Sequence, residues 1–437
     1  MTPLLDAYFA RLNRRQPWRW SGQVIQSVGQ TVESAGPPVS VGECCEILDR
    51  SGRAHPAEVI GFRGSSVLSM PLESTEGVRF GDSVLALGER PQIDAGPALM
   101  GRVLNAFGEA IDQGPPLCLP ARLALDGAVR SPLERAPIRQ PLGTGIRVID
   151  ALLTAGRGQR VGIFGGSGVG KSTLIGMMTR NTEADVTIVG LVGERGREVG
   201  EFLEDALGEE GRARSVVVVS TSDQSPLLRM RAALAATTLA EYFATQGRSV
   251  LLVLDSLTRF AMAAREIGLA AGEPPTNKGY TPSVFSRLAR LIERTGNFRT
   301  GSITAFYTVL MEGDDQQDPL VDAVRSLLDG HVVLSRSLAA EGWYPPVEVL
   351  DSISRLMPSV TEPAHREQAA LLRRLMAVYA RSEDLVRIGA YKAGSDPELD
   401  RALRARAALR GFLIQDSADR APFAETVRRL AQLAGEV

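Results

Sequence analysis

The spacing of hydrophobic positions divides the chain into regions with different periods. Between about residues 22 and 87, short alternating or β-branched runs stand at 24–28, 39–41, 57–62, 66–70 and 83–87. Turn-forming residues separate these runs at 36–38, 49–52 and 80–82. Several short strands at this close spacing favour a small antiparallel β-barrel, which we place at residues 21–90.

Longer apolar runs alternate with helical patterns from about residue 145 onward. The runs at 186–192, 215–220, 250–254, 302–310 and 331–334 are typical of strands buried on both faces, and helical patterns stand at 200–209, 227–246 and 283–294. This alternation predicts an α/β domain with a mainly parallel sheet and a ligand site at the carboxyl ends of its strands. We assign residues 91–358 to this domain. Residues 91–144, punctuated by glycine and proline, are expected to be a connector with little regular structure.

The two ends of the chain have patterns of their own. After Pro358 the sequence is helical and arginine-rich, with no strand pattern up to Val437, which predicts an all-α domain at 359–437. Residues 1–20 mix arginines with apolar side chains at loosely helical spacing. That segment is either a helix for oligomerisation, membrane or partner contact, or a frayed terminus, and the pattern leaves both open.

Composition and charge narrow the possible classes of protein. The 437 residues carry 49 Lys and Arg against 51 Asp and Glu, so the overall charge gives no argument for nucleic acid as the main ligand. Cys44, Cys45 and Cys118 form neither a metal-ligand spacing nor a disulfide framework. No apolar run approaches the ~20 residues of a membrane span, and the first ten residues lack a signal-peptide core. We therefore expect a cytoplasmic protein.

The most specific chemical signal follows the apolar run at 161–164. There the chain matches the pattern G-x-x-x-x-G-K-[ST] between a predicted strand and a predicted helix. The residues are Gly165, Gly166, Ser167, Gly168, Val169, Gly170, Lys171 and Ser172, followed by Thr173. Glycines let backbone N–H groups surround phosphate oxygens, and the helix N-terminus adds the positive end of its dipole. Lys171 is expected to reach the β- and γ-phosphates, and the Ser172 hydroxyl to bind Mg²⁺.

Two acidic residues at predicted strand ends extend this chemistry. Asp255 follows the apolar run 250–254, the arrangement that holds Mg²⁺, usually through water. Glu194 follows another strand and is a candidate to orient and polarise the water that attacks the γ-phosphate. Arg195 is a candidate to steady that loop or the phosphates. For Arg197 and Glu198 we favour a solvated helix start.

A third stretch combines an aromatic residue with a later arginine. Tyr344 lies beside two prolines, and Arg355 follows eleven positions on. A ring held in this way can stack on a base, and an arginine can act as a finger in phosphoryl transfer. From spacing alone, however, we favour a core tyrosine and an arginine in a surface salt bridge.

Together these motifs are more specific than any one of them. They stand in order at 162–174, 190–198, 255–260, 272–275, 279–285, 301–308, 312–315, 328–331 and 350–355. The chain resembles the catalytic subunits of the F-type and V-type rotary ATPases and, within that superfamily, the type III secretion ATPases and their flagellar export relatives. The stretches 260–274 and 40–44 look closer to the virulence (injectisome) branch than to the flagellar branch.

The resemblance implies a β-barrel, a RecA-like P-loop ATPase core and a C-terminal helical domain. It implies that Lys171, Ser172 and Thr173 contact phosphate and Mg²⁺, and that Asp255 is the Walker B acid. Glu194 becomes the water-activating carboxylate and Tyr344 the adenine-stacking ring. Arg355 matches the arginine that such proteins lend to the neighbouring subunit. The interpretation of Tyr344 and Arg355 from spacing alone is thereby reversed.

The implied activity is Mg-dependent ATP hydrolysis that energises type III secretion of effector proteins through a ring-shaped motor, with a flagellar export ATPase as the alternative. Because Glu194 and Arg355 lie in one chain, identical subunits can complete every site, as in a homohexamer. The family implies central stalk and stator proteins, chaperone–effector complexes and an export gate at the inner membrane as partners. It also implies a location at the cytoplasmic face of that membrane.

Two hypotheses of other classes remain at this stage. A hexameric RNA translocase needs a central basic or aromatic track, of which the arginine-rich tail is the only hint. A non-catalytic ring subunit would not need Lys171, Glu194 and Asp255. We expect no nucleic-acid partner.

Overall fold

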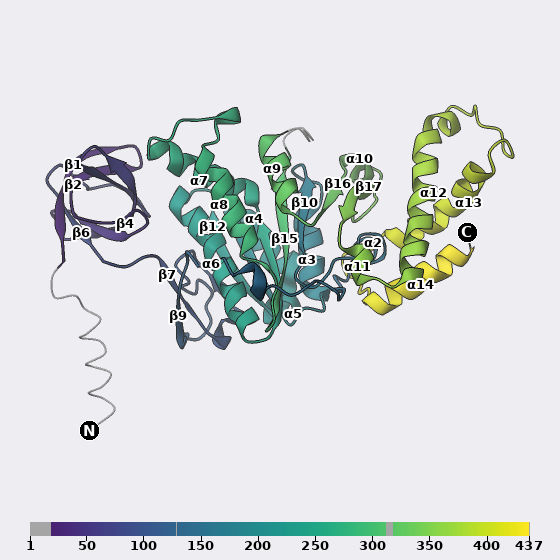
Figure 1. The fold of residues 1–437 in the computed structure, drawn as a ribbon, viewed down its shortest axis with the longest axis horizontal. Helices are drawn as coiled ribbons and strands as arrows, with labels where there is room; N and C mark the ends of the chain where they lie inside the picture. Colours follow the sequence, from purple (N-terminus) through teal and green to yellow (C-terminus); the bar gives the residue numbers. More distant parts are fainter. Residues whose placement is uncertain (1–18, 128, 312–317, 437) are drawn as a thin grey trace, which may run out of the picture. The chain divides into compact units, whose positions relative to one another are not determined.

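The computed structural model describes residues 19–127, 129–311 and 318–436 (Figure 1). They form two compact units. One holds the residues up to Gln92 with the short segments Ser225–Leu228 and Glu266–Pro274, and the other holds the rest of the chain. The predicted contact segment at 1–20 lies outside the described residues except for Arg19 and Trp20. The motif at 312–315 also lies outside them.

Six antiparallel strands close into a barrel in the order β1-β2-β5-β4-β3-β6. They are β1 (Ser21–Val28), β2 (Thr31–Ala35), β3 (Cys44–Leu48), β4 (Ala54–Arg63), β5 (Ser66–Pro71) and β6 (Ser83–Ala86). Alternate side chains point inward, as a half-buried strand requires: in β3, Cys45 and Ile47 are buried. Closure leaves the barrel without a free strand edge.

The predicted barrel is confirmed, but not every strand within it. The run 39–41 is not a strand, and β2 and β3 were not predicted. Pro37 and Pro38 cannot donate to a strand ladder, so the apolar residues after them lie in a turn. The sequence of β3 carries Glu46 among its apolar positions, and its pairing with β4 and β6 decides that it is a strand.

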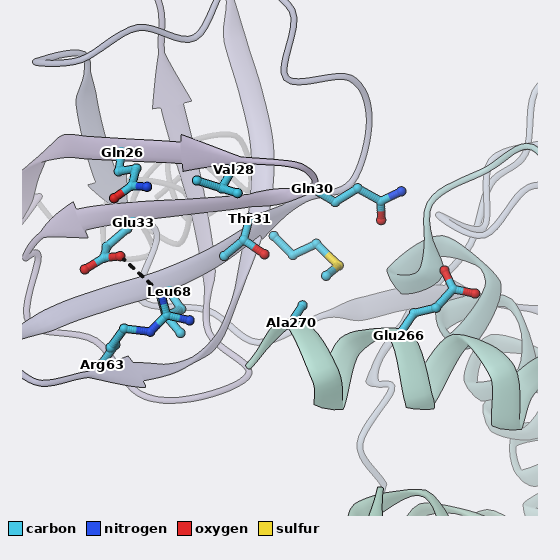
Figure 2. Close-up of a pocket in the computed structure, with 10 residues that line it drawn as sticks. Gln26, Val28, Gln30, Thr31, Glu33, Arg63, Leu68, Glu266 and Ala270 are labelled. Atoms are coloured by element: carbon cyan, nitrogen blue, oxygen red, sulfur yellow. Dashed lines mark ion pairs between the residues drawn. The ribbon is translucent and has the colours of Figure 1, made fainter. Parts of the chain in front are cut away.

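Polar side chains cover part of the outer barrel wall. Gln26, Glu33 and Arg63 extend from three of its strands, and Arg63 Nη1 lies 3.7 Å from Glu33 Oε2 (Figure 2). The Arg63 side chain is 62% exposed, so water screens the pair and it adds at most about 1 kcal/mol to stability.

The second unit is built on a nine-stranded sheet in the order β17-β16-β10-β15-β13-β11-β12-β8, with β14 paired to β15. The strands are β8 (Val103–Leu104), β10 (Arg160–Gly165), β11 (Val186–Glu194), β12 (Ser215–Thr221), β13 (Ser249–Asp255), β14 (Gly296–Asn297), β15 (Ser302–Leu310), β16 (Gly330–Leu334) and β17 (Val347–Ser354). The pairings are parallel except for β14–β15 and β16–β17. Each of the five strands predicted in this region is present.

Helices connect these strands and pack against the sheet (Figure 1). They are α2 (Arg147–Leu152), α3 (Lys171–Asn181), α4 (Gly196–Glu201), the π-helix η3 (Phe202–Leu207), α5 (Gly208–Ala213), α6 (Pro226–Thr245), α7 (Leu257–Ala270), α8 (Pro282–Glu293), α9 (Pro319–Leu327), α10 (Arg336–Ala340) and α11 (Met357–Val360). Short 3-10 turns stand at Pro97–Leu99, Pro132–Glu134 and Asn277–Gly279.

The connector has more regular structure than its composition predicts. β7 (Gln92–Ala95) pairs with β9 (Ala121–Ala124), and β8 joins the edge of the large sheet through β12. A two-residue strand is too short to show a hydrophobic period. Its place in the sheet follows from the burial of Val103 and Leu104.

Three helices end the chain, as predicted: α12 (Pro363–Arg387), α13 (Pro397–Leu413) and α14 (Phe423–Glu436). Their buried faces, with Leu372, Leu409 and Leu430, belong to the same hydrophobic core as Ile149 of α2 and Val349 of β17. The helical region is thus packed onto the sheet domain through α2 and β17. None of the helices in the described part of the chain has the length and apolar character that a bilayer span needs.

Candidate active site

The predicted site residues meet because four adjacent strands end at one edge of the sheet. In spatial order these are β10, β15, β13 and β11. The phosphate-loop sequence follows β10, Asp255 ends β13 and Glu194 ends β11. Parallel strands present their carboxyl ends at the same edge, so Lys171 and Asp255, 84 positions apart in sequence, come close together here.

The loop after β10 has the backbone that a phosphate cradle needs. Gly168 and Gly170 have positive φ angles of 77° and 88°, which side chains with a Cβ disfavour. Helix α3 begins at Lys171, and Ser172 and Thr173 are exposed in its first turn. The Lys171 ammonium lies back across the loop and donates to the carbonyl oxygens of Gly165 (3.1 Å) and Gly166 (3.0 Å).

Asp255 is a buried carboxylate with a partner that the sequence did not indicate. Its Oδ1 accepts a hydrogen bond from Thr308 Oγ1 at 2.6 Å, across from β15. Burial raises the pKa of Asp255, while this hydrogen bond and the Lys171 charge oppose the rise. Thr308 therefore fixes the orientation of the acid next to the lysine.

The carboxylates of Asp255 and Glu198 lie close enough to Glu194 to change its pKa. Burial, the Asp255 charge and a hydrogen bond with the Glu198 side chain raise the pKa of Glu194 to about 8, and the Arg259 charge opposes them. The expectation that Glu198 is only a solvated helix residue is wrong in this respect. The Glu198 side chain is 39% exposed. It nevertheless hydrogen-bonds to Glu194, the candidate general base, because the first turn of α4 brings it next to the end of β11.

The cations of the cluster balance these acids. Burial lowers the pKa of Lys171, and the charges of Asp255 and Glu194 act in the opposite direction. Arg259 and Arg336 lower it further. A desolvated lysine amid two carboxylates and two guanidinium groups is the environment of an anion site rather than of a surface patch.

Arg259 is a site residue that the sequence analysis missed. It lies in the first turn of α7, four residues after Asp255, and its Nε is buried without a hydrogen-bond partner among the described residues. Gly193 makes room for it: a Cβ at Gly193 would lie 3.0 Å from Arg259 Cβ. The sequence contains a signal that could have found Arg259: it is a basic residue one helical turn after the acid that ends β13.

Arg336, at the start of α10, covers the other side of the loop. A Cβ added at Gly166 would collide with the Arg336 guanidinium. This contact was not predicted, because residues 166 and 336 are brought together by the pairing of strands β10 and β16.

The Tyr344 ring lies beside the phosphate loop. Its Cε1 is 3.7 Å from the position of a Cβ on Gly170, and the residue is 47% exposed. The interpretation from spacing alone, a core tyrosine, is therefore wrong. An exposed ring next to the loop is available to stack on a base.

Arg355 lies at the opposite edge of the sheet. The β16–β17 hairpin pairs Leu334 with Val347 at one end and Gly330 with Ser354 at the other. Arg355 N donates to Asp329 O at 3.0 Å, and Asp329 N donates to Arg160 O at the start of β10. Since the six residues of β10 span about 20 Å, Arg355 cannot reach the phosphate loop of its own chain.

Arg195 lies at the surface beside the cluster. Its side chain is 77% exposed, and Nη1 lies 3.8 Å from Glu198 Oε1. The structure thus gives Arg195 a surface position beside the site, and its predicted role in catalysis stays a prediction.

The oxygen donors of the site suit a magnesium ion that is shared with a nucleotide. They are the Ser172 hydroxyl and the Asp255 carboxylate. Within the described ranges no three His, Cys, Asp or Glu side chains converge closely enough to enclose a metal. Mg²⁺ usually takes one or two protein oxygens and completes its shell with phosphates and waters, so this donor set fits.

Comparison with known proteins identifies the family. Residues 145–354 match the ATP synthase alpha/beta family, nucleotide-binding domain, and residues 24–88 match its beta-barrel domain. Residues 361–432 match the T3SS EscN ATPase C-terminal domain. The chain belongs to the family of type III secretion and flagellar export ATPases. This family is part of the ATP synthase alpha/beta superfamily.

Relatives from both branches of this ATPase family match most of the chain. A flagellum-specific ATP synthase of Treponema pallidum is 52% identical over 99% of this chain and 97% of its own length. The SPI-2 type 3 secretion system ATPase of Salmonella typhimurium is 50% identical over 88% of each. The assembled ATPase EscN of an enteropathogenic E. coli secretion system has a TM-score of 0.90 at 42% identity, covering 94% of this chain and 100% of that one. These matches confirm the predicted family, the three-part fold and the ATPase class.

Proposed function

We propose that this ATPase hydrolyses Mg·ATP to drive type III protein export. The observation that carries the proposal is the convergence of Lys171, Asp255 and Glu194 at one sheet edge. They lie in a chain whose whole length resembles export ATPases. A phosphate loop without the two acids would support nucleotide binding only.

Each residue has a role that follows from its position. The N–H groups of residues 165–170 and the Lys171 ammonium bind the phosphates, and Tyr344 stacks on the base. Ser172 and Asp255 would hold Mg²⁺, which neutralises charge on the β- and γ-phosphates when bound. Glu194 has a pKa raised to about 8 and orients and deprotonates the attacking water.

The position of Arg355 supports a ring in which neighbours share sites. It lies about 20 Å from its own phosphate loop, at the far end of β10. In a head-to-tail ring, the edge that carries Arg355 in one subunit can face the phosphate loop of the next. We propose a homohexamer in which Arg355 stabilises the transition state at the neighbouring subunit.

Mixing two inactive variants tests this arrangement. Lys171→Ala and Arg355→Ala should each abolish turnover. In rings reassembled from a 1:1 mixture, about a quarter of the sites would combine an intact Lys171 with an intact Arg355 from the neighbour. Recovery of ATPase activity on mixing is the expected result. If Arg355 acts within its own chain, no combination restores a site and the mixture stays inactive.

We infer the partners and the location from what is known of the relatives by name. EscN has been solved in complex with its central stalk EscO, and we propose a corresponding stalk for this chain. Stator proteins, chaperone–effector complexes at the C-terminal helices and an export gate are further proposed partners. They would place the ring at the cytoplasmic face of the inner membrane.

We further propose that the chain belongs to the virulence branch of the export family and not to the flagellar branch. Short stretches favour the virulence branch, while the flagellum-specific relatives are 45–52% identical and the type 3 secretion relatives 46–50% identical. The ranges overlap, so identity does not separate the branches. A gene deletion scored for motility and for effector secretion does: we expect loss of secretion with motility kept, and loss of motility alone would assign the chain to flagellar export.

A further inference from the structure

One short turn connects the C-terminal helices to the nucleotide site. It comprises residues 414–419, between α13 and α14, and we call it the 414–419 turn. Its Gln415 is only 1% exposed, although an amide side chain has donors and an acceptor to satisfy. A polar group buried to this extent is stabilised by its hydrogen bonds, so the partners of Gln415 indicate its role.

Gln415 bonds to two segments that lie far from it in sequence. Its Oε1 accepts from Arg147 N at 2.8 Å, and its Nε2 donates to Gly145 O at 2.8 Å. Nε2 also donates within the turn to Asp419 O at 3.2 Å. Its backbone N donates to Tyr344 O at 2.8 Å. One residue thus joins the main chain of the proposed base-stacking tyrosine to the start of α2.

The start of α2 is a firm anchor for this connection. The buried Asp150 carboxylate accepts hydrogen bonds from Thr144 N (2.9 Å), Thr144 Oγ1 (2.7 Å) and Gly145 N (3.0 Å). Gly145 is held at its N–H by Asp150 and at its carbonyl by Gln415. A movement of Gln415 relative to this segment would break buried hydrogen bonds.

The same turn also contacts the end of the helix that carries Lys171. Arg180 Nη2 donates to Ser417 O at 2.6 Å, and Asn181 Nδ2 donates to Asp419 O at 3.4 Å. The 414–419 turn therefore touches α3 at its last residues and the Tyr344 segment beside the first. Its hydrogen bond to Tyr344 O is the contact that lies next to Gly170, and through it the turn can act on the base.

We propose that Gln415 is a positioning residue that holds the Tyr344 ring beside Gly170, so that the C-terminal helices control the affinity for ATP through the base. The inference rests on the proposed stacking role of Tyr344. The main chain of Gln415 binds the tyrosine carbonyl, and its side chain holds that main chain to the start of α2. Loss of the side chain therefore changes the contact between Tyr344 and the base and leaves the phosphate contacts intact.

The test is Gln415→Met in the full chain, which keeps the length of the side chain and removes its hydrogen bonds to Arg147 N and Gly145 O, so that the main-chain bond to Tyr344 loses its anchor at the start of α2. We expect the KM for ATP to rise on the order of 10-fold with kcat within about twofold, the pattern of a lost binding contact. The inhibition constant of inorganic tripolyphosphate, which has no base, should not change. An equal loss of ATP and tripolyphosphate binding would overturn the inference, because it would show general damage to the site.

A matched control separates this role from general stability. His365 of α12 is also buried, and its Nε2 lies 2.8 Å from Ala151 O of α2. His365→Leu removes another hydrogen bond between the helical region and α2 without touching Tyr344. It should lower the thermal unfolding midpoint and leave the KM for ATP unchanged. A KM shift equal to that of Gln415→Met would contradict the inference.

A double-mutant cycle distinguishes the inference from the function on which it rests. If Gln415 acts through Tyr344, Tyr344→Ala combined with Gln415→Met has the KM of Tyr344→Ala alone. Additive effects would refute the coupling. If Tyr344→Ala raises the KM and Gln415→Met does not, the inference alone fails. If Tyr344→Ala leaves the KM unchanged, the stacking role and the inference fail together.

Discussion

At the scale of single residues, the site works by placing acids where burial and like charge keep them reactive. Asp255 and Glu194 come from adjacent strands, and the Asp255 charge makes Glu194 harder to ionise. Thr308, Glu198 and Arg259 set the orientation and charge of these two acids. Glu194 is therefore best tested against a nearby glutamate that lies outside this cluster of charges.

Glu194→Gln is predicted to abolish hydrolysis while ATP still binds. The amide keeps the shape of the side chain but cannot take a proton from water, so turnover should fall on the order of 10²–10⁴-fold. Steady-state hydrolysis and equilibrium binding of ATP with Mg²⁺ measure the two effects. The control is Glu201→Gln, an exposed glutamate of α4 that pairs with Arg197, which should hydrolyse ATP at the normal rate. Loss of activity in both variants would contradict a specific role for Glu194.

Asp150 is predicted to make stability depend on pH. Burial raises its pKa from 3.8 to about 7 in the folded chain. The folded state therefore keeps the proton between about pH 4 and pH 7 while the unfolded state has lost it. Stability then falls as the pH rises through this window, by at most about 1.4 kcal/mol per unit, and is level above it.

Comparison with Asp150→Asn isolates this effect, because all other groups titrate alike in the two proteins. The thermal midpoint of the natural chain minus that of the variant should decrease from pH 5 to pH 7 and then stay constant. A difference that grows with pH over that range would show that the carboxylate is stabilised in its charged form.

At the scale of elements, the ends of neighbouring strands position the site. Glu194 ends β11, and Gly193 before it has a φ of 71° and lies against Arg259 of α7. The bulge between Val192 and Glu194 in the β11–β12 ladder reorients the acid at this point. The strand end is thus shaped by one glycine that accepts both an unusual backbone and a close neighbour.

Gly193→Ala is predicted to lower kcat, because the added methyl group displaces Arg259 and with it the Glu194 loop. The backbone strain alone costs about 1–2 kcal/mol of stability. Gly208→Ala is the matched control: Gly208 has a φ of 63° and open space where its Cβ would lie. Both variants should unfold at lower temperature, and only Gly193→Ala should lose turnover. A normal kcat in Gly193→Ala would mean that the loop tolerates the displacement.

At the scale of the whole molecule, Tyr344 and Arg355 lie at opposite ends of the β16–β17 hairpin. One lies beside the chain's own phosphate loop and the other at the far edge of the sheet. In the proposed ring, each chain contributes its phosphate loop and Tyr344 to one site and Arg355 to the site of its neighbour. Assembly, and not folding alone, completes the catalytic machinery that we propose.

Turnover per chain is therefore predicted to rise with protein concentration. Below the concentration at which rings form, the chain should bind ATP and hydrolyse it slowly, because no neighbour supplies Arg355. Hydrolysis rates measured beside mass photometry over the same dilution series test this. A constant rate per chain from monomer to ring would exclude the shared site.

The sequence by itself determined the phosphate loop, the barrel, the buried strands and the helical end of the chain. These are local patterns: glycines that permit a backbone shape, alternation in a half-buried sheet, and long apolar runs in a parallel one. Lys171, Asp255 and Glu194 were predicted because each lies where a strand pattern ends. The connector strands, β2 and β3 were missed because pairing, and not local pattern, makes them strands.

Only the tertiary structure decided which residues meet. Thr308, Arg259, Arg336 and Gln415 enter the site or its support because strand order and helix packing join segments up to 270 positions apart. Burial, which local sequence does not specify, sets the pKa values of Glu194 and Lys171. The placement of Arg355 away from its own loop is likewise a consequence of strand direction: β17 runs antiparallel to β16 and to the strands that end at the site, so its carboxyl end lies at the opposite edge of the sheet.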